Sequence, residues 1–402
     1  MEGVFSMIFR FLGCILLIIG TCIGAGILAL PLATAQAGFY PSCLLLIICW
    51  CISTATAFYL LEINLKLPAN SNMISMARAT LGGPGQVVAW VLFLLMLYSL
   101  LCAYLTGGRD VIRDSLSAFH IQLPSVINTL IFLFIFGYIV FRGMRSIDWA
   151  NRGLMIGKLG ILCLLFFLLM PHVSETYLSK ENSLHALLPA TMVMVTAFGF
   201  SVIVPSLRVY LESHVFLLRA AIFMGSAIAL ICYLLWLTVI HGVIDKEGPQ
   251  GLIAIAHSTH QVSDLTQTLS HTLNNATLSS FIHLFTSICV ITSFLGVSLG
   301  LSDFIADGVG VRKKGSGHIV VYVLTFLPPL AVTLFFPGAF IKALNYAGFF
   351  CIILFLLMPT LMAWQLRRRK KEENAYQVCG GNWLLGLSFL TSLSLLVIGI
   401  LG

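Results

Sequence analysis

Long apolar runs separated by short polar segments make up most of the chain. A helix crosses the hydrocarbon core of a bilayer with about 20 apolar residues, and eleven runs come near that length. The predicted spans are residues 9–37, 40–65, 86–106, 123–141, 153–170, 187–209, 215–240, 278–298, 319–336, 339–361 and 383–401. Runs such as ILCLLFFLLM do not alternate as the strands of a membrane β-barrel do. The pattern therefore predicts an all-α polytopic membrane protein with about eleven transmembrane helices.

Composition supports a membrane protein and removes other classes. Of the 402 residues, 59% are hydrophobic and 9% are charged, whereas a soluble domain carries about 25% charged residues. The 11 cysteines are scattered through apolar runs, which excludes a disulfide-rich secreted scaffold. Cys49 and Cys51 form a C-x-C pair inside one predicted helix, where packing is favoured over metal binding. The net charge of +7 is attributed to the loops, and no nucleic-acid partner is expected.

The basic residues predict the orientation of the chain. If the N-terminus lies in the cytoplasm, 17 of the 22 Lys and Arg residues, Lys158 among them, fall in or beside cytoplasmic segments, as the positive-inside rule requires. The five on the opposite side are Arg109, Arg113, Lys180, Lys246 and Lys342. We expect an odd number of spans, a cytoplasmic N-terminus and an external C-terminus, with the RRRKK run at 367–371 as a topology anchor.

The longest polar stretch, residues 241–275, is external in this topology. Four apolar residues near helical spacing predict a short surface helix there: Val262, Leu265, Leu269 and Leu273. The histidines of the stretch are interpreted as ordinary loop residues rather than metal ligands: His257, His260 and His271. No catalytic cluster and no P-loop are found, so neither an enzyme nor an ATP-driven pump is expected, and no cofactor is expected.

Two predicted spans contain residues that a regular helix avoids. In the first, IIGTCIGAGILALP carries Gly20, Gly24 and Gly26; in the sixth, AFGFSVIVPSL carries Gly199 and Pro205. Glycine costs about 1 kcal/mol and proline about 3 kcal/mol inside a helix, and backbone groups freed in hydrocarbon need other partners. We predict broken helices whose unwound backbone lines a cavity. The alternative is close helix packing, for which Gly20-x-x-x-Gly24 is also suited.

The positions of the breaks indicate a repeated architecture. They fall in spans one and six, and Gly20 and Gly199 are 179 residues apart. Equivalent broken helices in two halves of five spans are typical of inverted-repeat transporters. We expect a single transporter domain over residues 1–402, with repeats at 9–172 and 187–366 and an extra helix at 382–402.

The direction of the helix halves suggests the class of ligand. New helix halves are expected to begin near Ala25 and Val204, and each directs the positive end of its dipole at the membrane centre, which suits a carboxylate. The preceding halves end near Thr21 and Phe198 and leave carbonyl oxygens for an ammonium group. A zwitterion fits both ends.

Four segments resemble known transporters. GTCIGAGILALP at 20–31 is similar to the opening motif of amino-acid permeases of the APC superfamily. YSLLCAYLTGG at 98–108, AFGFSVIVPSL at 197–207 and TSFLGVSLGLSDFIADG at 292–308 resemble the hydroxy and aromatic amino-acid permease family of bacteria, in particular its tyrosine and tryptophan permeases, including the short chlamydial type. The resemblance covers nearly the whole chain. It implies a five-plus-five inverted-repeat fold of the leucine-transporter type in the bacterial cytoplasmic (inner) membrane, and inward symport of an aromatic amino acid, generally with protons.

The resemblance also assigns site residues. The substrate-backbone loop of the family is matched by Gly20, Thr21, Gly24, Ala25 and Gly26. Ile23 lies within the same loop and is included with it.

Phe198 and Gly199 match the family's sixth-helix break, and Phe198 and Phe200 are placed to stack on a ring. The family commonly has Ser before Phe-Gly-Phe and His after it, whereas Ala197 and Ser201 stand here. This departure keeps a hydroxy or small neutral amino acid open as the substrate. Further pocket polarity is expected from a set that interhelical hydrogen bonding would also explain: Tyr98, Ser99, Tyr104, Thr292 and Ser293.

Coupling to protons needs an ionisable group inside the membrane, where it costs about 2.5–3.5 kcal/mol. Glu62 in the second span is the candidate, and the alternative is an ion pair with Lys66 one turn away. Asp303 and Asp307, with Arg312 beyond them, are interpreted as gate residues or a solvated helix end.

Sodium coupling is the less favoured alternative. Oxygen atoms of four residues form its expected site, with no carboxylate beside them: Thr21, Ile23, Thr292 and Ser293. A channel or passive facilitator also stays open and would show no accumulation of its substrate.

Overall fold

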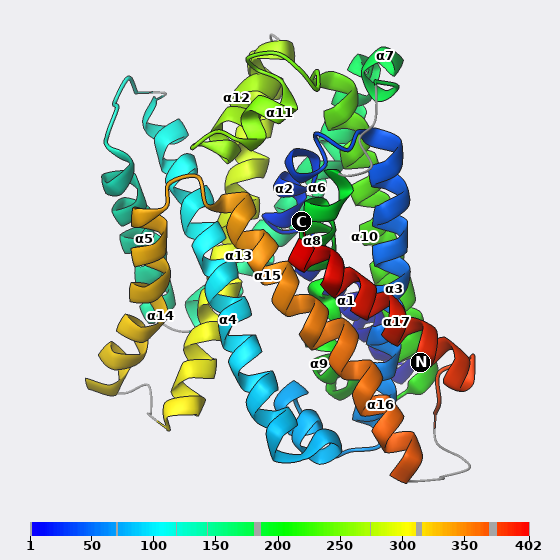
Figure 1. Cartoon of the computed structure of the whole chain (residues 1–402). Coiled ribbons are helices and arrows are strands. Elements are labelled where there is room, and N and C mark those ends of the chain that lie inside the picture. The colour runs from blue at the N-terminus through cyan, green and yellow to red at the C-terminus, as the bar shows by residue number, and fades with distance from the viewer. Residues whose placement is uncertain are drawn as a thin grey trace.

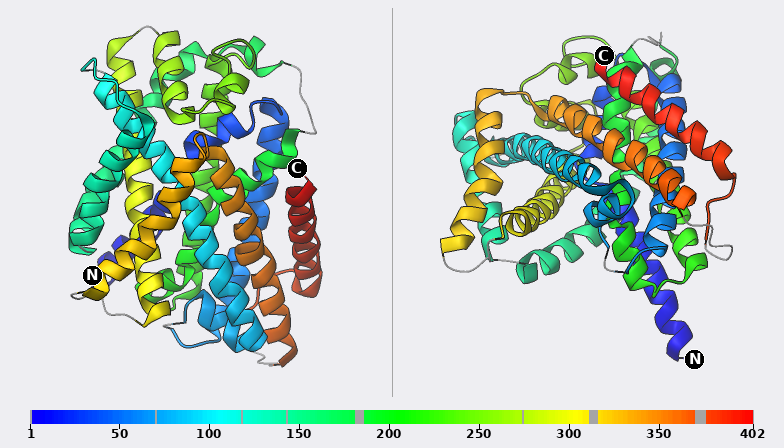
Figure 2. Two further views of the ribbon diagram at one scale, coloured as in Figure 1. Left: turned by 60° about the vertical axis from the view of Figure 1, so that its left-hand side comes forward. Right: turned by 60° about the horizontal axis from the view of Figure 1, so that its bottom comes forward.

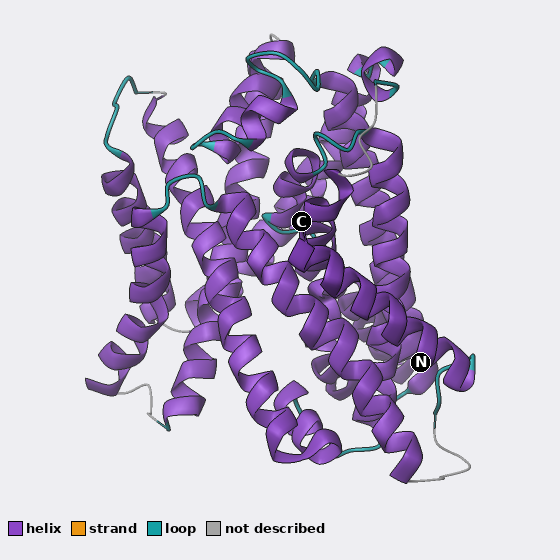
Figure 3. Ribbon diagram, in the orientation of Figure 1, coloured by secondary structure: helices purple, strands orange, loops and turns teal. Residues whose placement is uncertain are grey.

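The computed structural model describes residues 2–69, 71–117, 119–142, 144–180, 186–273, 275–310, 316–369 and 376–401. These residues form helices joined by short loops, with no strand among them (Figure 3). Ten of the described helices are long and apolar enough to span a membrane, and α1 (Glu2–Cys22) with α2 (Gly26–Ala33) makes an eleventh span bent by 48°. The predicted fold class and number of spans are confirmed.

The other helices follow in chain order. The first half of the chain continues with α3 (Phe39–Leu65), α4 (Met73–Ser117), α5 (Ser125–Arg142), α6 (Met144–Leu169) and the short α7 (Glu175–Leu178). The second half contains α8 (Leu187–Ala197), α9 (Val204–Tyr210), α10 (Val215–Val243), α11 (Leu252–Ala256), α12 (Gln261–Leu273), α13 (Ala276–Val309), α14 (Ser316–Phe335), α15 (Phe340–Cys351), α16 (Met358–Arg369) and α17 (Gly381–Leu401).

The long helices run alternately up and down in the view of Figure 1. α11 and α12 cover the upper end of the molecule, and α16 ends at its lower end. α5 and α14 lie on one side, and α3 and α10 pack together on the other (Figures 1 and 2). α17 runs along the outside of the bundle and packs against α8 and α16.

Two helices are longer than the apolar runs that predicted them. The predicted span 86–106 is only the middle of α4, and 278–298 is only part of α13. Hydropathy marks the segment that suits hydrocarbon, whereas a helix continues as long as its backbone bonds are made. α4 passes a non-helical glycine, Gly82 with φ +78°, and carries the buried charges Arg109 and Asp110 near its upper end. The predicted ends of these two spans are wrong for that reason.

The two broken spans differ in form. α1 ends at Cys22, and α2 begins at Gly26 with Ala25 as its N-cap, where a new helix half is predicted. In the sixth span, Gly199–Ile203 form a 3-10 turn between α8 and α9, and α9 begins at the predicted Val204. Both interruptions are confirmed, but only the first bends its span sharply.

The surface helix predicted within 241–275 is α12. Val262, Leu265 and Leu269 are buried on its inner face, while the side chain of Leu273 is outside the described part of the chain. A second helix, α11, precedes it and was not predicted.

Most of the outer surface is apolar. Phe134, Phe167 and Phe335 are 77%, 80% and 79% exposed, which suits contact with lipid chains and would promote aggregation in water. Inside the bundle, helices approach closely at glycines. A Cβ added to Gly348 of α15 would lie 2.1 Å from the backbone oxygen of Met192 in α8.

Candidate functional site

A cavity of about 450 Å³ lies beside both helix breaks. Its walls come mainly from α1, α2, α4, α13 and the 3-10 turn of the sixth span. The predicted site residues that line it are Gly20, Thr21, Gly24, Gly26, Gly199 and Ser293, together with Tyr104, Thr292 and Ala197. The structure thus brings together residues from spans one, three, six and eight, while their role in binding stays a prediction.

Ser293 of α13 holds the backbone of the first break. The Ala25 N–H donates to Ser293 Oγ over 2.8 Å. A Cβ on Gly24 would lie 2.5 Å from the same oxygen, so this close approach requires glycine at position 24. α2 begins at Gly26, which lines the cavity, and the N–H groups of Ile27 and Leu28 donate to the backbone oxygens of Gly24 and Ala25. The positive end of α2 therefore lies at the cavity.

Tyr233 of α10 joins the carbonyl ends of the two broken spans. Its hydroxyl lies within hydrogen-bonding distance of the backbone oxygens of Cys22 and Ala197, the latter at 3.0 Å. Cys22 and Ala197 end α1 and α8, and both line the cavity. Carbonyl groups were expected near Thr21 and Phe198. The structure has them one residue away, at Cys22 and Ala197.

Lys158 of α6 is the one charged side chain among the described residues that line the cavity. It is 1% exposed, and its Nζ donates to the backbone oxygen of Ile23. Counting Lys158 among the cytoplasmic flanking cations was therefore wrong. The sequence could have shown this, because residue 158 falls inside the predicted span 153–170, and an ionisable residue within a membrane span indicates a functional role.

The aromatic residues of the sixth-span break do not face the cavity. Phe198 and Phe200 are 1% and 0% exposed and are not part of its lining. Phe198 packs edge-on against Tyr233, with ring centroids 5.4 Å apart. In this structure the two rings pack into the protein and not against the cavity, and their stacking on a ligand stays a prediction. Ser201 is also buried away from the lining, and its Oγ has no hydrogen-bond partner in the described chain.

Four other expected residues contribute differently from the prediction. The Tyr98 hydroxyl donates to the backbone oxygen of Leu324 in α14 over 2.7 Å, so it makes the interhelical bond named as the alternative. Ser99 bonds within its own helix, to the oxygen of Leu95. Ile23 and Ala25 supply backbone groups to Lys158 and Ser293 and are not part of the lining.

The remaining cavity wall is largely apolar, and the sequence did not single it out. Phe93, Met96 and Leu100 of α4 face it, as does Phe355 of the π-helical segment Ile352–Leu357. Opposite α4, α13 presents two glycines one turn apart, Gly296 and Gly300; a Cβ on either would meet no atom within 4 Å. These residues lie in unbroken apolar runs, where periodicity does not distinguish a ligand-facing side chain from a core or lipid-facing one.

The cavity extends from the helix breaks toward the lower end and reaches the surface there. Its lining continues from the break down α1 to Leu17, down α4 to Phe93 and along α13 to Gly300. Leu17 is 44% exposed, and Gly296 and Gly300 are also exposed.

The upper end is closed by a polar cluster between α4 and α12. Asp110 is fully buried and accepts from Arg109 Nε over 3.1 Å, from the Val262 N–H over 3.3 Å, and contacts His260 Nδ1 at 3.0 Å. Arg109 also donates to the backbone oxygen of Thr259. These bonds fix the loop that carries α12 against the end of α4.

Glu62 lies in a different cluster, away from the cavity lining. Arg367 of α16 donates to both of its carboxylate oxygens, over 2.9 and 2.6 Å, and the Val378 N–H donates to Oε2 over 3.0 Å. Lys66 Nζ lies 3.7 Å from Oε1. The structure supports the ion-pair alternative, and it adds Arg367 as the principal partner.

No group of three or more His, Cys, Asp or Glu residues in the described chain is arranged to hold a metal ion. His260 bonds Asp110, His257 contacts Gln36 and His271 is exposed. Asp307 is exposed near the end of α13, which fits a solvated helix end; Asp303 lies one turn before it, and Arg312 is outside the described residues. Cys49 and Cys51 are both free thiols.

Comparison with known proteins agrees with this architecture. The chain matches the tryptophan/tyrosine permease family over residues 7–399. It is 32% identical over 394 residues to the tyrosine-specific transport system 1 of Haemophilus influenzae, covering 97% of this chain and 94% of that protein. It is also 32% identical to glutamine transporter 2 of Aliivibrio fischeri, over 97% of this chain and 99% of that one.

A solved structure has the same fold. The manganese transporter of Eremococcus coleocola superposes with a TM-score of 0.62 at 12% identity, covering 98% of this chain and 85% of that one, and its leucine-transporter-type fold agrees with the two interrupted spans seen here. On the strength of the match across nearly its whole length, the chain belongs to the tryptophan/tyrosine permease family.

Proposed function

We propose that the protein imports an aromatic amino acid, tyrosine or tryptophan, across the bacterial cytoplasmic membrane by proton symport. The observation that carries the proposal is the cavity at the two breaks, where helix-end polar groups adjoin an apolar chamber. Family membership and the tyrosine-specific relative support the substrate class.

The substrate backbone is placed between the helix ends. Its carboxylate faces the start of α2 at Gly26, where the helix dipole favours an anion. Its ammonium group faces the carbonyl oxygens of Cys22 and Ala197. The ring then extends along Gly296 and Gly300, which leave room for a flat group.

An aromatic side chain suits the chamber better than an amide. Phe93, Met96, Leu100 and Phe355 line it, and burying an amide among such groups without hydrogen bonds costs about 1–3 kcal/mol. Glutamine, suggested by the second relative, is therefore the second candidate. The hydroxy or small neutral amino acid left open by Ala197 and Ser201 would leave much of the chamber empty.

Coupling is assigned to Lys158 rather than Glu62. The Lys158 amine occupies the Ile23 carbonyl, one of the oxygens that a sodium site would need, and it is the charged group beside the unwound backbone. Loss of the proton from the Lys158 amine would weaken its bond to the Ile23 carbonyl and so its hold on the break. Glu62 is less suited because Arg367 already occupies both of its oxygens.

We place the N-terminus in the cytoplasm and the C-terminus outside, as the basic residues require. The lower end is then the cytoplasmic side, and the cavity faces the cytoplasm. Alternating access would close this mouth and release the cluster of Asp110 at the upper end, with 9–172 and 187–366 as the two repeats.

Uptake into proteoliposomes tests the proposal. Radiolabelled tyrosine, tryptophan and glutamine are offered with a proton gradient, a sodium gradient or neither. We expect accumulation of an aromatic amino acid only with the proton gradient, and its loss on adding a protonophore. Accumulation driven by sodium alone, or equilibration without accumulation, would contradict the coupling.

Lys158→Met separates coupling from binding. The variant should lose proton-driven accumulation but keep substrate binding, whereas Lys342→Met, an exposed lysine on α15, should behave as the unmodified protein. Unchanged accumulation in Lys158→Met would remove Lys158 from the mechanism.

A further inference from the structure

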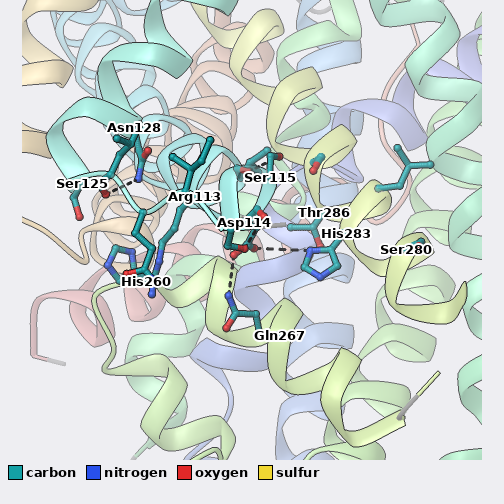
Figure 4. Close-up of a pocket in the computed structure, with 17 residues that line it drawn as sticks. Arg113, Asp114, Ser115, Ser125, Asn128, His260, Gln267, Ser280, His283 and Thr286 are labelled. Carbon is teal, nitrogen blue, oxygen red and sulfur yellow. Dashed lines mark hydrogen bonds and ion pairs between the residues drawn. The ribbon is translucent and has the colours of Figure 1, made fainter. Parts of the chain in front are cut away.

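A second, larger cavity lies at the upper end of the molecule. It measures about 1070 Å³ and is enclosed by the last turns of α4, the start of α5, α12 and the start of α13 (Figure 4). It shares no lining residue with the cavity at the helix breaks. Its charged and titratable lining groups are Arg113, Asp114, His260 and His283.

Arg113 is unpaired in this cavity. Its Nη1 atom is buried and has no hydrogen-bond partner in the described part of the chain. Arg109, one turn earlier on α4, shows the contrast, because it pairs with Asp110 and with the backbone of Thr259. A buried guanidinium nitrogen without an acceptor is costly, so an acceptor supplied by a ligand would stabilise it.

Asn128 of α5 presents an unused acceptor to the same cavity. The residue is 1% exposed, and its Nδ2 donates to the backbone oxygen of Leu123 over 3.3 Å. Its Oδ1 is buried and has no partner among the described residues. The site therefore offers a buried cationic donor and a buried neutral acceptor, both unfilled.

Asp114 adds negative charge beside them. Its Oδ1 accepts from Gln267 over 3.0 Å and from Ser263, whereas His283 Nδ1 lies 4.0 Å from Oδ2; Figure 4 shows Asp114 beside Gln267 and His283. Oδ2 thus keeps capacity to accept another donor. His260 is bonded through Nδ1 to Asp110. Among the Arg, Lys, Asp and Glu side chains of the lining, Arg113 and Asp114 supply one charge of each sign.

We propose that the upper cavity binds a zwitterion, with its anionic group on Arg113 and its ammonium group on Asn128 Oδ1 and Asp114. A simple anion or cation would satisfy only one of the two unfilled groups. Ile121, Leu123 and Leu284 of the lining are available to the apolar part of the ligand. Two ligands share this chemistry: a free amino acid, and the phosphate and ammonium of a phosphatidylethanolamine headgroup.

Binding to the full-length protein in phosphatidylglycerol nanodiscs tests the proposal and separates the two sources. Titration with tyrosine should reveal two sites in the unmodified protein and one in Arg113→Gln. Titration with dihexanoylphosphatidylethanolamine should show saturable binding that Arg113→Gln weakens, if the ligand is a lipid headgroup. Loss of the hydrogen bonds to a charged group should lower the affinity about 10- to 100-fold.

Matched variants identify the cause of any loss. Arg78→Gln removes an exposed arginine at the start of α4 and should change neither titration. Asn128→Leu should resemble Arg113→Gln, and Arg113→Lys should retain part of the affinity. Gly24→Leu should remove only the tyrosine site at the helix breaks. The site that each variant retains then shows that the variant is folded.

The outcomes decide the question. Equal binding of both ligands to the unmodified protein and to Arg113→Gln would overturn the proposed site. If tyrosine does not bind at all but the lipid does, with loss in Arg113→Gln, the upper site stands and the proposed transport of tyrosine fails.

Discussion

The two ends of the molecule are held by contacts of different kinds. At the upper end, Asp110 ties α4 to the loop before α12, and Thr34 after α2 bonds His241 of α10 at 2.9 Å, so the contacts cross over the top of the cavity. At the lower end, Glu62 ties α3 to α16, and Arg208 of α9 donates to the backbone oxygen of Asn64 in α3. These contacts join helices beside the mouth, whose walls are α1, α4 and α13.

The difference between the two ends indicates which contacts must change for the cavity to open at the upper end. The buried charges at the upper end can separate only if they find water or other partners, because an unpaired buried charge costs several kcal/mol. The lower mouth has to narrow by movement of α1 against α4 and α13. Exchange between the two states is therefore expected to depend on the upper cluster more than on the lower one.

The largest effect is expected from Asp110→Asn. The change leaves Arg109 buried without its carboxylate, which costs about 3–5 kcal/mol for a buried pair. Hydrogen exchange followed by mass spectrometry should show faster exchange in α12 than in the unmodified protein, and no change near residues 376–380. Unchanged protection of α12 would mean that this carboxylate does not hold the upper end closed.

Glu62→Gln should act at the other end and more weakly. Arg367 keeps its bond to the Gly381 carbonyl at 2.9 Å, and the side chains of Arg367 and Lys66 are less deeply buried than that of Arg109, so a loss of about 1–3 kcal/mol is expected. Exchange should rise near residues 376–380 and in the first turn of α17, and α12 should be unaffected. The same experiment as for Asp110→Asn thus tests whether the two ends are independent.

Gly24→Ala probes the break between the two ends. Its new Cβ would meet Ser293 Oγ at 2.5 Å, whereas Ser293 Cβ is 3.7 Å away. Forcing this contact should cost about 1–3 kcal/mol and reduce tyrosine binding. In a double-mutant cycle with Ser293→Ala, the double variant should be no worse than Ser293→Ala alone, because the clashing oxygen is gone; additive losses would contradict the contact.

The smallest change in stability is expected from Gly296→Ala with Gly300→Ala. The added methyl groups meet nothing within 4 Å, and alanine is better than glycine within a helix by about 0.5–1 kcal/mol. The thermal midpoint should stay the same or rise slightly, while affinity for tryptophan falls more than affinity for tyrosine, because the larger ring needs more of the glycine surface. Gly386→Ala on α17 is the matched control.

Much of the fold followed from the sequence because the bilayer fixes how long an apolar helix must be. The ends of α4 were missed because charged residues such as Arg109 and Asp110 continue a helix when each finds a partner, and pairing between distant segments is not visible in hydropathy. The pairing of α12 with α4 is of this kind.

The candidate site was predicted where the backbone itself is unusual. Gly24 and Gly26 signal their role because a regular span would not contain them. Phe198 and Phe200 do not line the cavity because the direction of a side chain at the end of α8 and in the following 3-10 turn depends on local dihedral angles, which composition does not give. Lys158 was missed for a different reason, because an intramembrane lysine was counted with the charges at the membrane edge.

The Tyr233 hydroxyl, which lies against the two broken spans, has one proton to give. The backbone oxygens of Cys22 and Ala197 both lie within its reach, and the Cys22 oxygen also accepts from the Gly24 N–H over 2.9 Å. One hydroxyl proton bonds one of the two oxygens at a time, so the junction of the broken helices has room for a further donor. An ammonium group carries three N–H donors on one atom. A bound substrate can therefore supply that further donor, and the bond is lost when the substrate leaves.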